Sequence, residues 1–410
     1  MKKYIILILF ASAISPLGAS GEEGLTLEQA VTIALQRNLE ILLAQKDLVT
    51  ATAKRLQMEA ISDPALVFST EGIGLKKRSD GSNEKEISLG LEQDLEFPGK
   101  RALRGKIGMF GEERSALELE RVRLLIAARV KKAYYKAVLA QRTIGALDHA
   151  ASLLDQFIEN LLVKYQSGAA LYSDVLRARV EKARLENQII EERKESGTAR
   201  AVLNLLMGRR GDESMNLATD MTYVPMKEDL PGLKEEARAS RPSLKISALK
   251  RRMFETGLGM ARMSRLPDFS LGLYFPSLRA GAWGFSVGLT VPLWGKRQKG
   301  EILEAEAAND GAIILAEQEE RRLMAGIESA YASVRAAEEQ VKVFEQKLLK
   351  DMEDELKLGL SYYQYGKIEF FNLLDLYRTY AAARLEHLKS LYLYLVSLAD
   401  LEVAGEEYAD

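Results

Sequence analysis

The sequence predicts a mainly α protein with membrane β-strands, arranged as two structural repeats. Three observations predict this fold. Two long stretches without proline carry apolar residues at coiled-coil spacing, and short segments in each half alternate apolar with small or polar residues. Similar landmarks also recur in the same order in both halves of the chain. We therefore expect long packed helices joined to short two-faced strands.

The first 20 residues predict export. They read MKKYIILILFASAISPLGAS, with two lysines, an apolar run from Tyr4 to Ile14, then Pro16 and small residues. This is the order of a secretory signal peptide, and its apolar run is too short to span a membrane. We expect residues 1–20 to be a signal peptide. A mature chain that enters a membrane must then do so as strands, because no later apolar run is long enough for a spanning helix.

Composition limits the function classes. The chain has 410 residues, a formal net charge of −2 and no cysteine. A nearly neutral chain does not predict a nucleic-acid partner. The two histidines, His149 and His387, are far apart, so we assign no metal site. We also expect no cofactor and no enzymatic activity, because the sequence contains neither a phosphate-binding loop nor an arrangement of nucleophile and base.

The two repeats are visible as matching segments. RNLEI at Arg37 matches RPSLKI at Arg241, with Asn38 opposite Pro242, and Pro64 matches Pro267. YQSG before residue 169 matches YQYG before residue 367. We expect a first repeat at 21–207, a linker at 208–232 and a second repeat at 233–410. Each repeat contains a leading helix, a β-hairpin and a long helical hairpin.

The long helices follow from the proline-free stretches 99–224 and 293–410. In the first stretch, apolar residues from Ile126 to Tyr165 recur at alternating steps of four and three, which is the coiled-coil seam. A helix over 101–165 would be about 100 Å long at roughly 1.5 Å per residue. Gly168 and Gly366 are the expected turns at the tips of the two hairpins.

The strands are expected where the period changes to two. The β-hairpins are predicted at 65–97 and 268–293, with roughly ten residues per strand. LEFPGKR at Leu95 and VPLWGKR at Val291 are the expected joints between strand and helix. Proline ends the sheet pairing, Gly99 or Gly295 permits the bend, and the lysine and arginine help to hold the interface. The residues assigned to these joints are Pro98, Gly99, Trp294 and Gly295.

The strand count predicts an assembly. Four strands cannot close a barrel, and open sheet edges do not persist in lipid, so copies of the chain must associate. A dimer would give eight strands with a filled interior, and a trimer would give twelve with room for water. We favour a homotrimer whose helical hairpins form an α-barrel and whose strands form a 12-stranded outer-membrane β-barrel. This places the protein in the outer membrane with a long periplasmic extension.

These landmarks together resemble the TolC family of outer-membrane efflux channels. LTLEQAVTIALQRNLEI at Leu25 resembles the N-terminal helix motif, with Leu39 where the family usually has proline. YQSGAALYSDVLRA at Tyr165 and YQYGKIEFFNLLDL at Tyr363 resemble the two tip motifs, and DLEFPGKR at Asp94 resembles the heavy-metal efflux branch. The resemblance implies the exit duct of a tripartite efflux system. Its implied partners are a periplasmic adaptor (membrane fusion) protein and an inner-membrane pump of the RND type that supplies the energy.

The resemblance also assigns residues to the periplasmic tip. Asp174 matches an aspartate that latches neighbouring helices, Tyr363 matches its tyrosine partner, and Asp375 matches a gate aspartate facing the lumen. Asn372 stands where the other gate aspartate is expected. Ile368 stands where some members carry a latch arginine, so the latch would use Lys367 or differ altogether. Gly168 and Gly366 would expose the tips for adaptor docking. A purely structural reading remains for Asp174 as a helix cap, Tyr363 as seam packing and Asp375 as a solvated residue.

Other functions remain open. The outer-membrane component of a type I protein secretion system needs the same tube. A soluble periplasmic coiled-coil scaffold is a different class, and it predicts extraction without detergent. The sequence does not decide between metal cations, drugs and proteins as the exported substrate.

Overall fold

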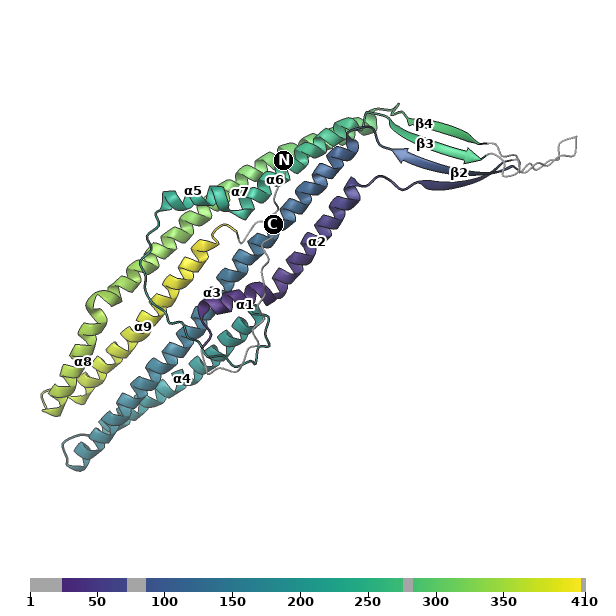
Figure 1. Ribbon diagram of the computed structural model, residues 1–410. Coiled ribbons are helices and arrows are strands. Elements are labelled where there is room, and N and C mark those ends of the chain that lie inside the picture. The colour runs from purple at the N-terminus through teal and green to yellow at the C-terminus, as the bar shows by residue number, and fades with distance from the viewer. Residues whose placement is uncertain (1–23, 72–85, 276–282, 407–410) are drawn as a thin grey trace, which may run out of the picture.

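The computed structural model describes residues 24–71, 86–275 and 283–406. The chain is elongated, with helices along most of its length and a strand ribbon at one end (Figure 1). The predicted signal peptide and the turn RSDGSN at 78–83 lie outside the described residues. No helix in the described ranges has both the length and the apolar character to cross a membrane.

Each leading helix is broken in two. We expected one helix per repeat, whereas the first repeat has α1 (Leu27–Arg37) and α2 (Leu39–Glu59), and the second has α5 (Leu230–Ser240) and α6 (Pro242–Met263). Asn38 causes the first break because its Oδ1 accepts a hydrogen bond from Glu40 N at 2.9 Å and caps α2. Its Nδ2 donates to Leu206 O at 2.9 Å, so the side chain also caps a distant helix.

The second break has a similar long-range hydrogen bond from a different residue, but no side chain of the described residues caps α6. Arg241 precedes α6, and its Nη2 donates to Leu401 O at 3.2 Å near the end of the last helix of that repeat. Pro242 is the first residue of α6, where a proline ring fits because the missing N–H has no helical partner. Leu39 is the first residue of α2. Leu39, rather than Asn38 as the sequence alignment had it, is therefore the counterpart of Pro242.

The strands form one antiparallel sheet in the order β1-β2-β3-β4. They are β1 (Ala65–Glu71), β2 (Glu86–Leu95), β3 (Asp268–Phe275) and β4 (Gly284–Thr290). β1, β3 and β4 have 7, 8 and 7 described residues and are shorter than the predicted ten, whereas β2 has 10. Leu91 pairs with Leu66 on one side and with Leu273 on the other, so the two hairpins join through β2 and β3.

The long helices confirm the coiled-coil prediction in the first repeat. α3 (Lys100–Gln166) is a continuous helix of 67 residues, followed by α4 (Tyr172–Leu206). In the second repeat, α7 (Lys296–Val343) passes through a π-helical turn, η1 (Phe344–Leu348), into α8 (Leu349–Gln364). α9 (Phe370–Glu402) then returns along them. The π turn interrupts the regular spacing that the sequence carries through Phe344 and Leu348.

The buried core follows the predicted seam. Ile126, Val130 and Leu154 of α3 are fully buried. One cluster of buried residues lies around the middle of the molecule, and a second joins α3, α4, α8 and α9 toward the tips. The helices therefore build a core within one chain. The strands behave differently, since Leu66, Phe68, Phe285 and Val287 are 64–72% exposed.

Candidate functional site

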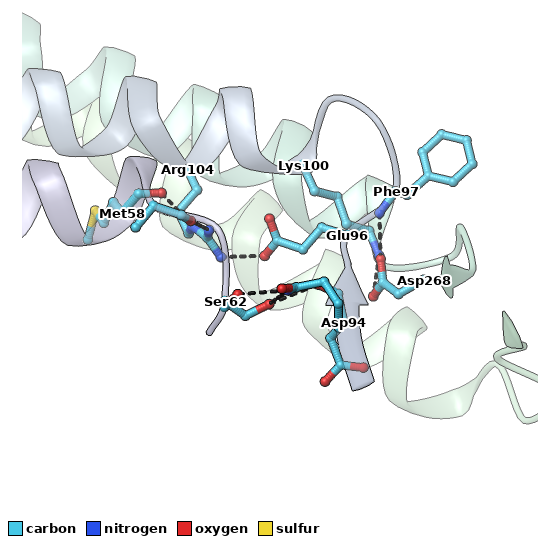
Figure 2. A network of polar contacts seen from close by, with 10 residues as sticks. Met58, Ser62, Asp94, Glu96, Phe97, Lys100, Arg104 and Asp268 are labelled. Atoms are coloured by element: carbon cyan, nitrogen blue, oxygen red, sulfur yellow. Dashed lines mark hydrogen bonds and ion pairs between the residues drawn. The ribbon is translucent and has the colours of Figure 1, made fainter. Parts of the chain in front are cut away.

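The joint between β2 and α3 is built around a lysine and an aspartate from different repeats (Figure 2). Lys100 Nζ lies 2.8 Å from Asp268 Oδ1 and 3.0 Å from Oδ2, and it donates to Leu266 O at 3.1 Å. Phe97 N donates to Asp268 Oδ1 at 2.8 Å, and the Phe97 ring stacks on Phe269 at 6.2 Å between centroids. One carboxylate therefore fixes the start of β3 against the start of α3.

A second cation holds the leading helix to the same joint. Arg104 Nε donates to Met58 O at 2.6 Å and Nη2 donates to Ala60 O at 2.8 Å. These are carbonyls at the C-terminal end of α2, where helix ends leave acceptors unpaired. Arg104 also forms an ion pair with Glu96 in the loop after β2. The expected role of cations at the joint thus falls on Lys100 and Arg104, whereas Arg101 is exposed.

The two joint glycines differ. Gly99 precedes α3 with φ 101°, a left-handed conformation that glycine adopts without steric cost. Gly295 precedes α7 with φ −58°, which any residue adopts, so the expectation that glycine is needed for the bend holds for one joint only. Pro98 is exposed in the first joint, and Trp294 is 84% exposed in the second.

Both tip turns use the same backbone device. Gly168 has φ 75° and its N–H donates to Tyr165 O at 3.0 Å, while Ala169 N donates to Lys164 O at 2.7 Å. Gly366 has φ 69°, with matching hydrogen bonds from Gly366 N and Lys367 N. This is the Schellman arrangement, which satisfies carbonyls at a helix end and favours glycine.

The tips of the two hairpins meet through Lys164 and Tyr363. Lys164 Nζ donates to Tyr363 O at 3.1 Å and lies 4.0 Å from the centroid of the Tyr363 ring. Burial raises the pKa of the Tyr363 hydroxyl, and the negative charge of Asp174 raises it further. Asp174 itself pairs with Arg177 at 3.7 Å. Asp174 and Tyr363 thus lie in one tip cluster, although no hydrogen bond joins them in the described part of the chain.

The two predicted gate residues lie outside this cluster. Asn372 and Asp375 are exposed on α9, one helical turn apart and on the same face, while Leu373 and Leu374 between them are buried. Lys367 lies over the Tyr362 ring at 5.5 Å, and Ile368 is partly buried against the tip core. The structure therefore separates an exposed pair on α9 from the packed cluster around Tyr363.

Two contacts between the hairpins were not predicted from the sequence. Tyr377 OH donates to Ala150 O at 2.7 Å, and Arg378 of α9 forms an ion pair with Glu181 of α4. The Glu181 side chain is only 11% exposed and also pairs with Arg184 at 3.4 Å. Burial raises the pKa of the Tyr377 hydroxyl. The sequence signal for this ion pair is Glu181 itself, because a glutamate stands there at a helical seam position where a buried residue is expected.

The sheet has one apolar face and one small or polar face. The polar face is concave and encloses a hollow of about 370 Å³ whose lining includes Ser69, Glu92 and Ser286. The four described strands contain no Lys, Arg or His. Glu92 and Asp94 are exposed on the polar face, and neither carboxylate forms an ion pair with the described residues. The concave side is therefore acidic and free of cations along the strands.

A comparison with known families identifies the family of the chain. The sequence profile described as "Outer membrane efflux protein" matches residues 30–209 and 233–404, which is most of the chain and both repeats. The chain belongs to the outer membrane efflux protein family. This confirms the TolC-type membership that the motifs predicted, and the family is one of efflux proteins rather than of enzymes.

Individual relatives agree with the family. The chain is 22% identical to the cobalt-zinc-cadmium resistance protein CzcC of Cupriavidus metallidurans over 370 residues, covering 89% of this chain and 86% of CzcC. A membrane protein from Pseudomonas aeruginosa has a TM-score of 0.81 at 19% identity, covering 92% of this chain and 93% of that one. The CmeC outer membrane channel of Campylobacter jejuni has a TM-score of 0.79 at 18% identity, covering 93% and 86%. The predicted fold class is confirmed.

Proposed function

We propose that three copies of this chain form an outer-membrane channel that serves as the exit duct of a tripartite efflux system. The observation that carries this proposal is the sheet, which is apolar on its convex side, acidic on its concave side and unpaired at β1 and β4. Such a ribbon buries its apolar face in lipid and its edges against other ribbons. The long helices then continue the same wall away from the membrane (Figure 1).

The number of copies follows from the size of the lumen. Two copies would give eight strands, whose interior is filled by side chains, whereas three give twelve and leave a water-filled channel. The helices supply matching free faces. Leu39 and Leu43 of α2, and Ile314 and Leu315 of α7, are 62–71% exposed in the single chain. These faces are covered when α7 of one copy packs against α2 of the next.

The shape of the chain and its family support the proposed partners. A passive duct uses no energy of its own, so transport needs an inner-membrane pump, which we propose to be of the RND type, and a periplasmic adaptor between the two. Adaptor docking is proposed at the helical tips, where Gly168 and Gly366 expose the turns. Tyr165, Leu171 and Tyr365 are 46–77% exposed there and offer an apolar surface.

Gating is proposed at the same tips. Asp174 and Tyr363 would hold neighbouring helices together in the closed state. Asn372 and Asp375 would face the lumen. Asp174→Ala should then raise conductance or antibiotic uptake. Unchanged leakage would remove the latch role and leave Asp174 as part of the first turn of α4.

The proposed cargo is divalent metal cations. Two observations support this class: CzcC is named for cobalt, zinc and cadmium resistance, and the strands of this chain carry only acidic charges on the concave face. Carboxylates along a lumen raise the local concentration of cations and repel anions.

Reconstitution tests the proposal directly. The purified protein should require detergent, sediment as a trimer and conduct ions in planar lipid bilayers. Expression together with a periplasmic adaptor and an RND pump should raise the tolerance of a sensitive strain to zinc, cobalt or cadmium. A freely soluble particle without conductance would instead support a periplasmic coiled-coil scaffold, and secretion of a protein substrate would support a type I secretion duct.

A further inference from the structure

The joint between β2 and α3 provides a template for a joint that one chain cannot complete. Within the chain, β2 of the first repeat pairs with β3 of the second, and Lys100 reaches across that boundary to the segment Leu266-Pro267-Asp268. The second repeat carries the same joint at β4 and α7, with Lys296 in the place of Lys100. β4 is an edge strand, so the partner of this second joint must come from another copy.

The partner segment is identified by the repeat. The counterpart of Leu266-Pro267-Asp268 is Asp63-Pro64-Ala65, whose last residue begins β1. Ala65 stands where Asp268 stands, so the carboxylate that pairs with Lys100 has no direct equivalent. Asp63 stands where Leu266 stands, and it is the Leu266 carbonyl that Lys100 Nζ contacts at 3.1 Å. The acidic residue thus follows the proline in the second repeat and precedes the proline in the first repeat.

We infer that Lys296 of one copy forms an ion pair with Asp63 of the neighbouring copy, and that this pair closes the joint between copies. The inference rests on the proposed trimer and names the contact that holds its strand-to-helix boundary. Lys296 and Asp63 are both exposed in the single chain. Neither forms a hydrogen bond through its side chain or an ion pair with the described residues, so both are available.

The apolar contacts of the template transfer in the same way. Phe97 stacks on Phe269 within the chain. The corresponding residues between copies are Leu293 of one copy and Leu66 of its neighbour. These leucines are 74% and 70% exposed in the single chain. The strand register also transfers: Asp94 pairs with Ser270, which places Thr290 opposite Val67 of the neighbouring copy. Both residues then lie on the concave face, and Leu289 falls opposite Phe68 on the apolar face.

Charge exchange tests the ion pair. Lys296→Asp or Asp63→Lys alone places like charges together, so each should lower the temperature at which the detergent-solubilised trimer dissociates by several degrees and lower the trimer fraction. The combination Lys296→Asp with Asp63→Lys should restore both. The matched control is Lys299→Asp with Asp63→Lys, one helical turn along α7, which should give no restoration. Restoration by the control as well, or no restoration by the exchanged pair, overturns the inference.

Cysteine cross-linking tests the register in a chain that has no native cysteine. Thr290→Cys with Val67→Cys should give disulfide-linked dimers and trimers under mild oxidation. Thr290→Cys with Ser69→Cys, shifted by two residues on the same face, should not. Linkage in the shifted register overturns the register while leaving the proposed trimer intact. A protein that sediments as a monomer and links in neither register overturns the proposed trimer itself.

Discussion

Lys100 Nζ lies 2.8 Å from Asp268 Oδ1, and the pair joins the first helix of one long hairpin to the first residue of a strand from the other repeat. The Lys100 side chain is 12% exposed and that of Asp268 is 45% exposed. The contact is thus partly shielded from solvent, and it fixes the angle between the sheet and the helices.

Removal of this cation should destabilise the joint. Among the described residues, Lys100→Met leaves the Asp268 carboxylate with the Phe97 N–H as its remaining donor and removes the hydrogen bond to Leu266 O. We expect a loss of about 1–2 kcal/mol, which is below the roughly 1.5–3 kcal/mol of a shielded hydrogen bond to a charged group because the Asp268 side chain is 45% exposed. The midpoint of thermal unfolding, followed by circular dichroism in detergent, measures it. Arg101→Met is the control and should leave the midpoint unchanged, and equal midpoints for both variants would contradict the prediction.

The ion pair between Arg378 and Glu181 should influence the width of the tip. Arg378→Met cuts a link between α9 and α4 and leaves Glu181 with Arg184 alone. If the link contributes about 1.4 kcal/mol to the closed arrangement, its loss shifts the ratio of open to closed tips about tenfold. Single-channel recordings should then show a larger mean conductance. Arg384→Met changes an exposed arginine on the same helix and should conduct like the parent. If Arg378→Met also conducts like the parent, the hairpins do not move apart and the prediction is wrong.

Two glycines of α3 and its C-terminal turn should respond to alanine with opposite signs. Gly168→Ala forces a side chain into φ 75° and should cost about 1–2 kcal/mol locally. Gly145 is exposed within α3 with open space around it, so Gly145→Ala should stabilise the helix by about 0.5–1 kcal/mol. Amide hydrogen exchange resolves the two effects. Faster exchange is expected at the tip of Gly168→Ala, and unchanged exchange there would show that the turn tolerates a side chain.

The sequence was sufficient for features that depend on local pattern. The regular spacing from Ile126 to Leu161 predicted α3, because apolar residues at alternating steps of four and three fall on one face of a helix. The alternation in β3 and β4 predicted strands, and Gly168 and Gly366 predicted the tip turns. Each of these follows from residues close together in the chain.

Features that depend on distant partners could not be predicted in this way. The break at Asn38 is stabilised by its hydrogen bond to Leu206 O, and the joint pair by a contact across the repeat boundary. The π turn after Val343 changes the phase of a seam that the sequence shows as continuous. Gly99 and Gly295 look identical in their motifs, yet only the first has a positive φ. Asn38 does cap α2 locally, but the distant contacts that complete these features are tertiary, and no local pattern encodes those contacts.

Glu338 should give the protein part of its resistance to acid. It is nearly buried on α7, accepts a hydrogen bond from Tyr223 OH at 3.0 Å and pairs with Arg335 at 2.7 Å. Burial alone would raise the pKa of this carboxyl, but the hydrogen bonds and the charges of Arg335 and Lys342 lower the pKa below its ordinary value. A lowered pKa stabilises the fold above the unfolded-state pKa, and this contribution is lost as the pH falls through the folded-state pKa.

Glu338→Gln should therefore lower stability near neutral pH by about 1–3 kcal/mol and make the acid-induced loss below roughly pH 5 shallower. Unfolding midpoints measured from pH 7 to pH 3 test both parts. Glu339→Gln is a neighbouring control, because the Glu339 side chain is 73% exposed and pairs only with Lys342. Parallel pH profiles for Glu338→Gln and the parent would show that Glu338 titrates without linkage to folding.

The acidic concave face should determine the charge preference of the channel. Glu92 pairs through its backbone with Ala65 and Gly272, and Asp94 with Ser270, so no cationic side chain stands beside either carboxylate on the sheet. In three copies the double variant Glu92→Gln with Asp94→Asn would remove six negative charges from one short length of lumen. We expect the reversal potential in a tenfold KCl gradient to move toward zero, because cations would no longer be concentrated there. Glu235→Gln with Glu236→Gln, at two exposed positions of α5, removes the same number of charges outside the sheet and should keep the parent value. Since the Debye length is about 10 Å at 0.1 M salt, the difference between the two variants should shrink as the salt concentration rises. A reversal potential that is equal in the parent and the double variant at low salt would place the selectivity elsewhere, with Asp375 on the exposed face of α9 as the next position to change.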